Sequence, residues 1–290
     1  MRFFNLFRYD LRRGRLFSPG RLFAVVSLFS FLFLCFCVDV FQGFYFELKS
    51  FWEINSLSLS FGDVLLGKTG GILPQNAQSQ SFLFPTEWLA IQMLLCYFTL
   101  GYFREDFTRG GVQVIPRMGS KTVWWLSKCL WNICSVTLYY CLGYGTLLFL
   151  TVLTGKSPSF TLNSSVFEFY FSCPLPAANA SQGELFLALC VLPWLTAVAV
   201  NLVQMALTIV LKPALAYLAT GCWLVVGVYY AHAFVLPNYS LSVRSGAVGV
   251  YGFQSTLGIA LCLGTGLLAV AAGLFGLRRK DMIDSQTAFS

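Results

Sequence analysis

The sequence predicts an all-α polytopic membrane protein with six transmembrane helices, an amphipathic N-terminal interfacial helix and both termini in the cytoplasm. Three observations lead to this prediction. The composition is strongly apolar, six apolar stretches are long enough to cross a bilayer, and lysine and arginine are concentrated in alternate loops. The chain is expected to form one transmembrane domain over residues 1–290.

The composition leaves too few charged side chains for a soluble surface. Hydrophobic residues make up 57% of the chain and charged residues only 11%, and the mean hydropathy is +0.70. These values exclude a disordered chain and a small disulfide-stapled secreted module. In so apolar a chain, the formal net charge of +7 indicates a charge bias between membrane faces and not a nucleic-acid-binding surface.

The predicted spans are continuously apolar, whereas the strands of a membrane β-barrel would alternate apolar and polar residues. A hydrocarbon core of ~30 Å takes ~20 helical residues. In lipid, helices satisfy the backbone groups of such continuous segments. The expected spans are residues 22–41, 86–103, 122–153, 183–211, 214–234 and 253–277.

The distribution of lysine and arginine predicts the orientation. Fifteen of them fall on one side: six in the N-terminal segment, five in the loop after the second span up to Lys128, Lys212 between the fourth and fifth spans, and three after the last span. The other side carries four, which are Lys49, Lys68, Lys156 and Arg244. Because positively charged loops tend to stay in the cytoplasm, both termini are expected there.

Residues 1–20 have the pattern of a helix that lies in the headgroup layer and ends near residues 18–20. Arginines lie away from an apolar stripe that covers about one third of a helical wheel. The stripe consists of Phe3, Phe4, Phe7 and Leu11. A basic flank that only sets the topology is the alternative. No small-residue cleavage site follows the first apolar run, so a cleaved signal peptide is not expected.

Three loops are expected on the outer side. Residues 42–85 are predicted to form a small irregular cap with one short strand, because polar and apolar residues alternate over 56–61. Residues 154–182 form a second loop, and residues 237–252 a short, Gly-rich third one. These loops contain three Asn-x-Ser glycosylation patterns, at Asn163, Asn179 and Asn238.

Residues 62–69 match the phosphate-loop pattern G-x-x-x-x-G-K-T. This motif requires a strand before the loop and a helix after it, so that backbone amides converge on a phosphate. Here Gly70, Gly71 and Pro74 follow directly, and the loop is expected on the outer side. The match is interpreted as chance, and this chain is not expected to hydrolyse nucleotide or to hold a cofactor.

Cysteine and histidine suggest neither catalysis nor metal binding. Nine of the ten cysteines lie in or beside apolar spans, where free cysteine behaves as a small hydrophobic residue. Only Cys173 lies in an outer loop, so no disulfide between outer loops is expected. The single histidine, His232, is interpreted as an interfacial residue. With one histidine, the sequence contains no paired cluster of metal ligands and no Ser-His-Asp set. No catalytic residue and no metal ligand is predicted.

Polar residues inside the spans are scarce. Asp39, Glu87 and Glu184 fall at the outer ends of spans, and no ionisable residue lies at the middle of one. This pattern disfavours an ion-coupled carrier. Asn201 and Gln204, three positions apart in the fourth span, share one helix face. They either line a transport path or hydrogen-bond a neighbouring helix.

The cytoplasmic connection between spans two and three, residues 104–121, is the most informative segment. It contains an acidic pair, one helical turn, two glycines and a Pro-Arg turn. These features predict a short helix below the membrane, followed by a return into span three. The alternative is an ordinary positive loop with an aromatic belt at Trp124, Trp125 and Trp131.

With this segment, the six spans and the amphipathic N-terminus, the chain resembles the ABC-2-type permeases of ATP-binding-cassette exporters over essentially its whole length. The resemblance implies that the segment is the coupling helix, which docks on an ATPase subunit. By resemblance, the docking contacts are Glu105, Asp106 and Arg109, the helix ends at Gly110 and Gly111, and the return comprises Pro116, Arg117, Gly119 and Lys121. The third outer loop is short for the re-entrant helices that family members often have.

The resemblance also implies partners and a mechanism. Two permease chains, identical or different, enclose a path in the lipid bilayer, and two ATPase subunits bind ATP with Mg²⁺ and hydrolyse it. The coupling helices transmit their closure to the spans. An amphipathic or lipid-like cargo, with a peptide antibiotic as the preferred class, is expected at a bacterial plasma membrane. No nucleic-acid partner is expected.

Two other classes stay open. An accessory or structural membrane protein would keep cargo handling unchanged when residues 104–121 are altered. A membrane-embedded lipid enzyme would need a convergent polar site near one interface. The candidates for such a site are Glu87, Glu184 and His232, all expected on the outer side.

Overall fold

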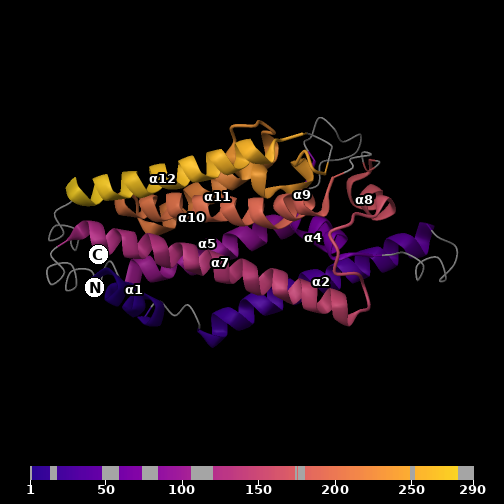
Figure 1. The fold of residues 1–290 in the computed structure, drawn as a ribbon, viewed down its shortest axis with the longest axis horizontal. Helices are drawn as coiled ribbons and strands as arrows, with labels where there is room; N and C mark the ends of the chain where they lie inside the picture. Colours follow the sequence, from indigo (N-terminus) through magenta and orange to yellow (C-terminus); the bar gives the residue numbers. More distant parts are fainter. Residues whose placement is uncertain are drawn as a thin grey trace.

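A computed structural model of the chain describes residues 2–13, 18–47, 59–73, 84–105, 120–173, 175, 180–248 and 252–279. In these ranges every named element is a helix, and the only β pairing is two isolated bridges. Figure 1 shows an elongated bundle with α1 (Arg2–Arg13) and the last turns of α12 (Ser255–Arg279) at one end. The opposite end carries α4 (Phe61–Thr69) and α8 (Ser164–Phe171). These are called the α1 end and the α4 end below.

A helix occupies each of the six predicted spans. They are α2 (Pro19–Glu47), α5 (Thr86–Glu105), α7 (Lys121–Leu153), the continuous run of α9 (Gln182–Phe186), η3 (Leu187–Val191) and α10 (Leu192–Val210), α11 (Pro213–Tyr229), and α12. Four helical stretches are long and apolar enough to cross a membrane: Pro19–Gln42, Lys121–Leu153, Gln182–Val210 and Ser255–Arg279. The apolar parts of α5 and α11 are shorter.

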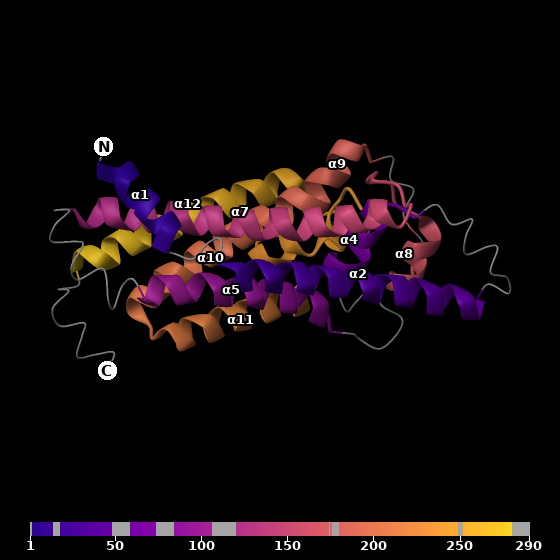
Figure 2. The ribbon, with the colours of Figure 1, turned by 90° about the horizontal axis from the view of Figure 1, so that it is seen from below.

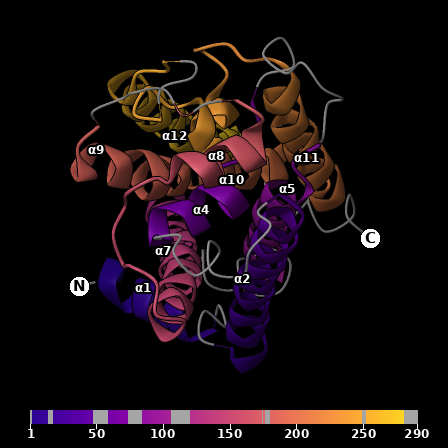
Figure 3. The same ribbon diagram turned by 90° about the vertical axis from the view of Figure 1, so that its right-hand side faces the viewer.

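Helix α10 lies at the centre of the bundle. In the most apolar part of the Gln182–Val210 stretch, 67% of residues are buried, about twice the share in the other three long stretches. Viewed along the bundle, α7, α12, α11 and α5 surround it (Figure 3). By contrast, α2 and α12 expose large apolar side chains, including Phe23, Phe31, Leu267 and Leu268. A helix that is buried on one side and apolar on the other is suited to contact lipid.

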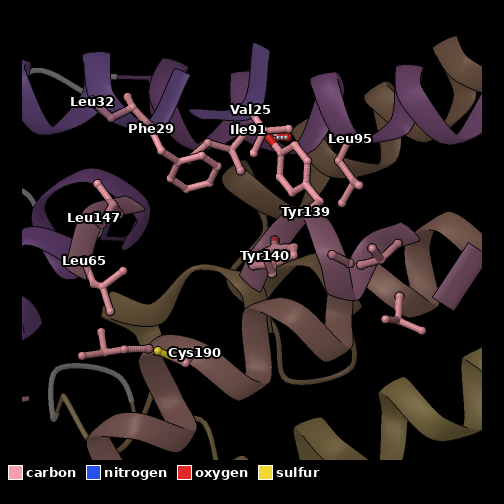
Figure 4. Close-up of a cluster of buried hydrophobic side chains, with 14 of the residues drawn as sticks. Val25, Phe29, Leu32, Leu65, Ile91, Leu95, Tyr139, Tyr140, Leu147 and Cys190 are labelled. Carbon is pink, nitrogen blue, oxygen red and sulfur yellow. Dashed lines mark hydrogen bonds between the residues drawn. The ribbon is translucent and has the colours of Figure 1, made fainter. Parts of the chain in front are cut away.

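The core on the α2 side forms where α2, α4, α5 and α7 meet (Figure 4). The ring of Phe29 packs edge-on against the ring of Tyr139, with 5.8 Å between centroids. The hydroxyl of Tyr139 donates to the backbone oxygen of Ile91 at 3.0 Å. Leu65 of α4 belongs to the same cluster, so the short helix α4 shares the core of the longer helices.

Two glycines of α7 provide a matched test of this packing. A Cβ built on Gly143 would lie 2.4 Å from the Phe29 ring, whereas one on Gly145 would meet nothing within 4 Å. We expect Gly143→Ala to lower the free energy of unfolding by about 1–3 kcal/mol through overpacking. Gly145→Ala should raise it by up to about 1 kcal/mol, because alanine is the better helix former. Thermal unfolding of both variants in detergent measures the difference. Equal effects would contradict this account of how α2 packs on α7.

The central helix contains a one-turn π-bulge at η3 that Pro193 explains. Proline has no N–H, so the oxygen of Leu189, four residues earlier, loses its helical donor. The hydroxyl of Tyr144 on α7 supplies a replacement at 3.3 Å, and the N–H of Leu192 reaches back to the oxygen of Leu187. The buried carbonyl of Leu189 is therefore paired although Pro193 removes its backbone donor.

The first outer loop is more regular than predicted. In the described part of residues 42–85, helix α4 occupies residues 61–69 in place of an irregular cap. Of the described residues 59–61 of the expected strand, only Ser60 pairs, in an isolated bridge with Ser157. A reciprocal capping box between Ser60 and Asp63 begins the helix. The backbone N–H of Asn163 donates to the buried carboxylate of Asp63 at 2.7 Å, which ties α4 to the start of α8. Burial raises the pKa of Asp63, and these hydrogen bonds partly offset the shift.

The N-terminal segment forms the predicted amphipathic helix, α1, over Arg2–Arg13, and residues 14–17, before the expected end near residues 18–20, lie outside the described residues. Its apolar side chains Phe7 and Leu11 pack against Tyr102 of α5 and Trp131 of α7. Phe4, by contrast, is 73% exposed. The apolar stripe is therefore only partly available to lipid, because part of it covers the bundle.

Candidate functional site

A fully buried polar cluster joins three helices at the α1 end. The ammonium of Lys128 on α7 donates to Asp10 of α1 at 2.6 Å and to the hydroxyl of Tyr102 on α5 at 3.0 Å. Tyr102 in turn donates to Asp10 at 2.8 Å, and the hydroxyl of Ser127 donates to the second Asp10 oxygen. The side chains of Lys128 and Asp10 are 1% and 0% exposed. We call these four residues the inner cluster.

Aromatic side chains enclose the inner cluster. The ammonium of Lys128 lies 4.7 Å from the centroid of the Tyr102 ring and 5.5 Å from that of Trp124. The rings of Tyr102 and Trp131 are 4.2 Å apart. A buried charge is costly unless it is paired and hydrogen-bonded, and here both charges are. The cluster therefore holds α1, α5 and α7 in one relative position.

The inner cluster lies next to the segment for which the sequence predicts a coupling role. Tyr102 lies three residues before the end of α5, and Lys128 lies in the second turn of α7. These two helices are the stems of the 106–119 segment, so the cluster links both stems to each other and to α1. Lys121, at the start of α7, donates to the oxygen of Leu277 near the end of α12 at 3.2 Å.

The predicted coupling residues fall almost entirely outside the described residues. Glu105 is the last residue of α5, and its side chain is not among the described ones. Five further positions lie beyond the described ranges: Asp106, Arg109, Gly110, Pro116 and Arg117. The docking role of all six therefore stays a prediction, while Ser120 is placed as the N-cap of α7.

The two candidate path-lining residues of α10 are buried and contact α5. Asn201 accepts a hydrogen bond from the hydroxyl of Thr99 at 2.7 Å, and the Gln204 amide donates to the oxygen of Cys96 at 3.1 Å. Each is 1% exposed. The sequence left two interpretations open for this pair, lining a transport path or hydrogen-bonding a neighbouring helix. The structure favours the second.

At the α4 end, a half-open cavity of about 250 Å³ lies between α2, α4, α8 and the start of α5. Its polar wall is an ion-pair triad, in which Lys68 contacts Asp39 at 2.5 Å and Glu87 at 3.0 Å. Tyr170 donates to Asp39 at 3.2 Å. Aromatic side chains complete the lining: Phe84, Trp88, Tyr170 and Phe171. We call this space the outer cavity.

Electrostatics keep Lys68 charged in the outer cavity. Burial alone lowers the pKa of the ammonium, but hydrogen bonds and charges from Asp39 and Glu87 outweigh it, so the pKa lies above its ordinary value. Burial and the neighbouring Asp39 carboxylate raise the pKa of Tyr170. Lys68 is also the lysine of the phosphate-loop pattern. Because residues 62–69 form helix α4, they do not adopt the loop that would cradle a phosphate.

The loop between α11 and α12 is a compact plug, in which residues 236–245 are all buried. Two short 3-10 helices, η4 (Leu236–Ser240) and η5 (Ser242–Arg244), form it. Arg244, 0% exposed, donates to the backbone oxygens of Ile72 at 3.0 Å, Gly227 at 2.8 Å and Val228 at 2.6 Å, and to the side chain of Asn238. Two of these oxygens belong to the last turn of α11, whose negative dipole end favours a cation.

This plug contains two residues that the sequence analysis singled out, Arg244 and Asn238. Arg244 was counted among outer-side loop charges, yet it is an internal cap of α11. Asn238 carries a glycosylation pattern, yet it is 1% exposed, and its amide donates to the oxygens of Tyr230 and His232 at 2.8 and 3.0 Å. In the folded chain this asparagine is not available for modification.

A family model described as "Protein of unknown function (DUF2705)" matches residues 35–283. The chain belongs to this family. No curated protein and no solved structure matches the chain. The matched region of this DUF2705 protein runs from the middle of α2 to beyond the end of α12. It includes Lys68, Lys128 and Arg244, whereas α1 and Asp10 precede it.

The residues considered for an enzyme site have separate local partners in this DUF2705 protein. Glu87 pairs with Lys68, and Glu184 caps α9 through Ser181. The exposed His232 accepts a hydrogen bond from the N–H of Phe234 at 3.3 Å. Among the described residues, no group of three or more His, Cys, Asp or Glu residues could hold a metal ion.

Three functional candidates escaped sequence reasoning: Lys68, Lys128 and Arg244. Each was counted as a loop charge, and each is buried. For Lys128 a signal existed, because it lies between Trp124 and Trp131 at helical spacing within an apolar run. Lys68 and Arg244 stand in polar loop sequence, where nothing local indicates burial.

Proposed function

We propose that this DUF2705 protein is the transmembrane permease subunit of an ABC-2-type transporter, with six spans, both termini cytoplasmic and ATP hydrolysed by a separate subunit. The inner cluster is the observation that carries this proposal. It makes α1, the end of α5 and the start of α7 one mechanical unit. A force applied to the 106–119 segment would reach all three helices together.

The distribution of charge supports the orientation. Arg8, Lys121, Arg278 and Arg279 lie on α1, the start of α7 and the end of α12, which share the α1 end of the bundle (Figure 1). The carboxylates of the cavity and of the loops around α8 and α9 lie toward the opposite end. Lysine and arginine collect on the cytoplasmic side of membrane proteins, so the α1 end would face the cytoplasm of a bacterial cell.

The outer cavity supports an amphipathic cargo, with a peptide antibiotic as the preferred class. It combines an ion-pair triad with aromatic walls at the outer end of the bundle. Such a space suits a molecule that has both a polar and an apolar part. A second permease chain would enclose the path, and the exposed apolar faces of α2 and α12 are available for that chain or for lipid.

Affinity purification of the tagged chain from its native membrane tests the proposal. We expect an ATPase subunit to co-purify with the wild type and to be lost from the Glu105→Lys, Asp106→Lys double variant. Glu168→Lys, which reverses an exposed charge on α8 at the opposite end, is the matched control and should retain the ATPase. Unfolding midpoints of all variants establish that they are folded. If the wild type brings down no ATPase, or the double variant retains it, the proposal is wrong and an accessory membrane protein takes its place.

A further inference from the structure

A small polar cavity lies where α5, α7 and α10 meet. Its lining includes Thr99, Asn132, Asn201, Gln204 and Thr208. Its volume is about 10 Å³, close to the ~10–15 Å³ that one water molecule needs. The five polar residues of the lining are all buried.

Two side-chain oxygens of this cavity have no hydrogen-bond donor. They are Asn132 Oδ1 and Gln204 Oε1, and both side chains belong to residues that are 1% exposed. The orientation of the Gln204 amide follows from its partner, because its nitrogen donates to the carbonyl oxygen of Cys96. Buried amide oxygens are nearly always paired. Two unpaired amide oxygens that line the same cavity therefore indicate one hydrogen-bond donor that both share.

We propose that one water molecule is bound here and donates one hydrogen bond to Asn132 Oδ1 and the other to Gln204 Oε1. Water fits the volume and supplies the two donors that these oxygens lack. A sodium ion is similar in size, but the described lining provides no carboxylate to offset its dehydration. The water links α7 to α10 beside the direct Thr99–Asn201 bond between α5 and α10.

Infrared spectroscopy of the purified chain in lipid nanodiscs detects such a water directly. We expect the wild type to show an O–H stretching band that shifts when H₂¹⁶O is replaced by H₂¹⁸O and that is missing from Asn132→Leu. Asn5→Leu, which makes the same change at an exposed position of α1, should keep the band. If wild type and Asn132→Leu have the same isotope-sensitive bands, the site holds no water and the inference is overturned.

A thermal-unfolding cycle tests whether the ligand is shared and whether it is a cation. If the water is shared, Asn132→Leu and Gln204→Leu each displace it. The double variant should therefore lose less free energy of unfolding than the sum of the losses in the two single variants. Additive losses would contradict a common ligand. The wild-type midpoint should be equal in sodium chloride and choline chloride. A higher midpoint in sodium alone would assign the site to a cation instead. Neither measurement depends on an ATPase partner.

Discussion

Replacing Lys128 with methionine should lower the free energy of unfolding by about 3–5 kcal/mol, because it leaves the carboxylate of Asp10 buried without its cation. The midpoint of thermal unfolding in detergent should fall by roughly 10 °C. Lys128 is 1% exposed and donates to both Asp10 and Tyr102, so neither charge can be screened by water. Lys212→Met, at an exposed lysine before α11, is the control and should change the midpoint little.

The double variant Asp10→Leu, Lys128→Met separates the charge effect from lost packing. Replacing both members of a buried ion pair by apolar residues is often close to neutral, so the double variant should recover most of the stability that Lys128→Met loses. If the double variant is as unstable as Lys128→Met, the inner cluster stabilises the chain through its packing and not through its charges. If Lys128→Met unfolds like the control, α1 is not anchored as described.

Arg244→Met should destabilise the chain by a similar amount, about 3–5 kcal/mol. The change removes every hydrogen bond that the guanidinium donates and leaves three backbone oxygens and the Asn238 side chain buried without that donor. Thermal unfolding measures the loss. Arg279→Met, at an exposed arginine in the last turn of α12, should have little effect.

Arg244→Lys provides the discriminating comparison. Lysine keeps the positive charge but cannot present the planar fork of a guanidinium. We expect an intermediate loss, because one ammonium cannot reach oxygens of both residue 72 and the last turn of α11. A lysine variant as stable as the wild type would mean that charge alone, acting on the α11 dipole, holds the plug.

The positions of the spanning helices followed from the sequence because their signal is local. A segment that crosses lipid must be apolar over its whole length, and each predicted stretch contains a helix to within a few residues at most boundaries. Helices α4 and α8 were missed because they are only nine and eight residues long and lie in segments that are too short to cross a membrane. The Ser60-x-x-Asp63 capping pattern was the available signal for α4.

The candidate sites were much less predictable. Asp10 and Lys128 are 118 positions apart, and Arg244 and Ile72 are 172 apart. Counting lysine and arginine by loop assigns Lys128 and Arg244 each to a side of the membrane, but it does not identify a partner for either. Asn201 and Gln204 were recognised as a polar pair on one helix face, yet the cavity beside them required Asn132 from another helix.

Composition and hydropathy by themselves indicated helices that are long and apolar enough to cross a membrane, and the described residues contain four such helices. This could be predicted because length and apolarity are properties of each segment alone. The tertiary structure decided which charges are internal. Burial of Lys68, Lys128 and Arg244 depends on carboxylates and carbonyls that distant segments bring within hydrogen-bond distance. A charge can leave water only where such partners replace its hydration, and only the packing of the helices brings them together.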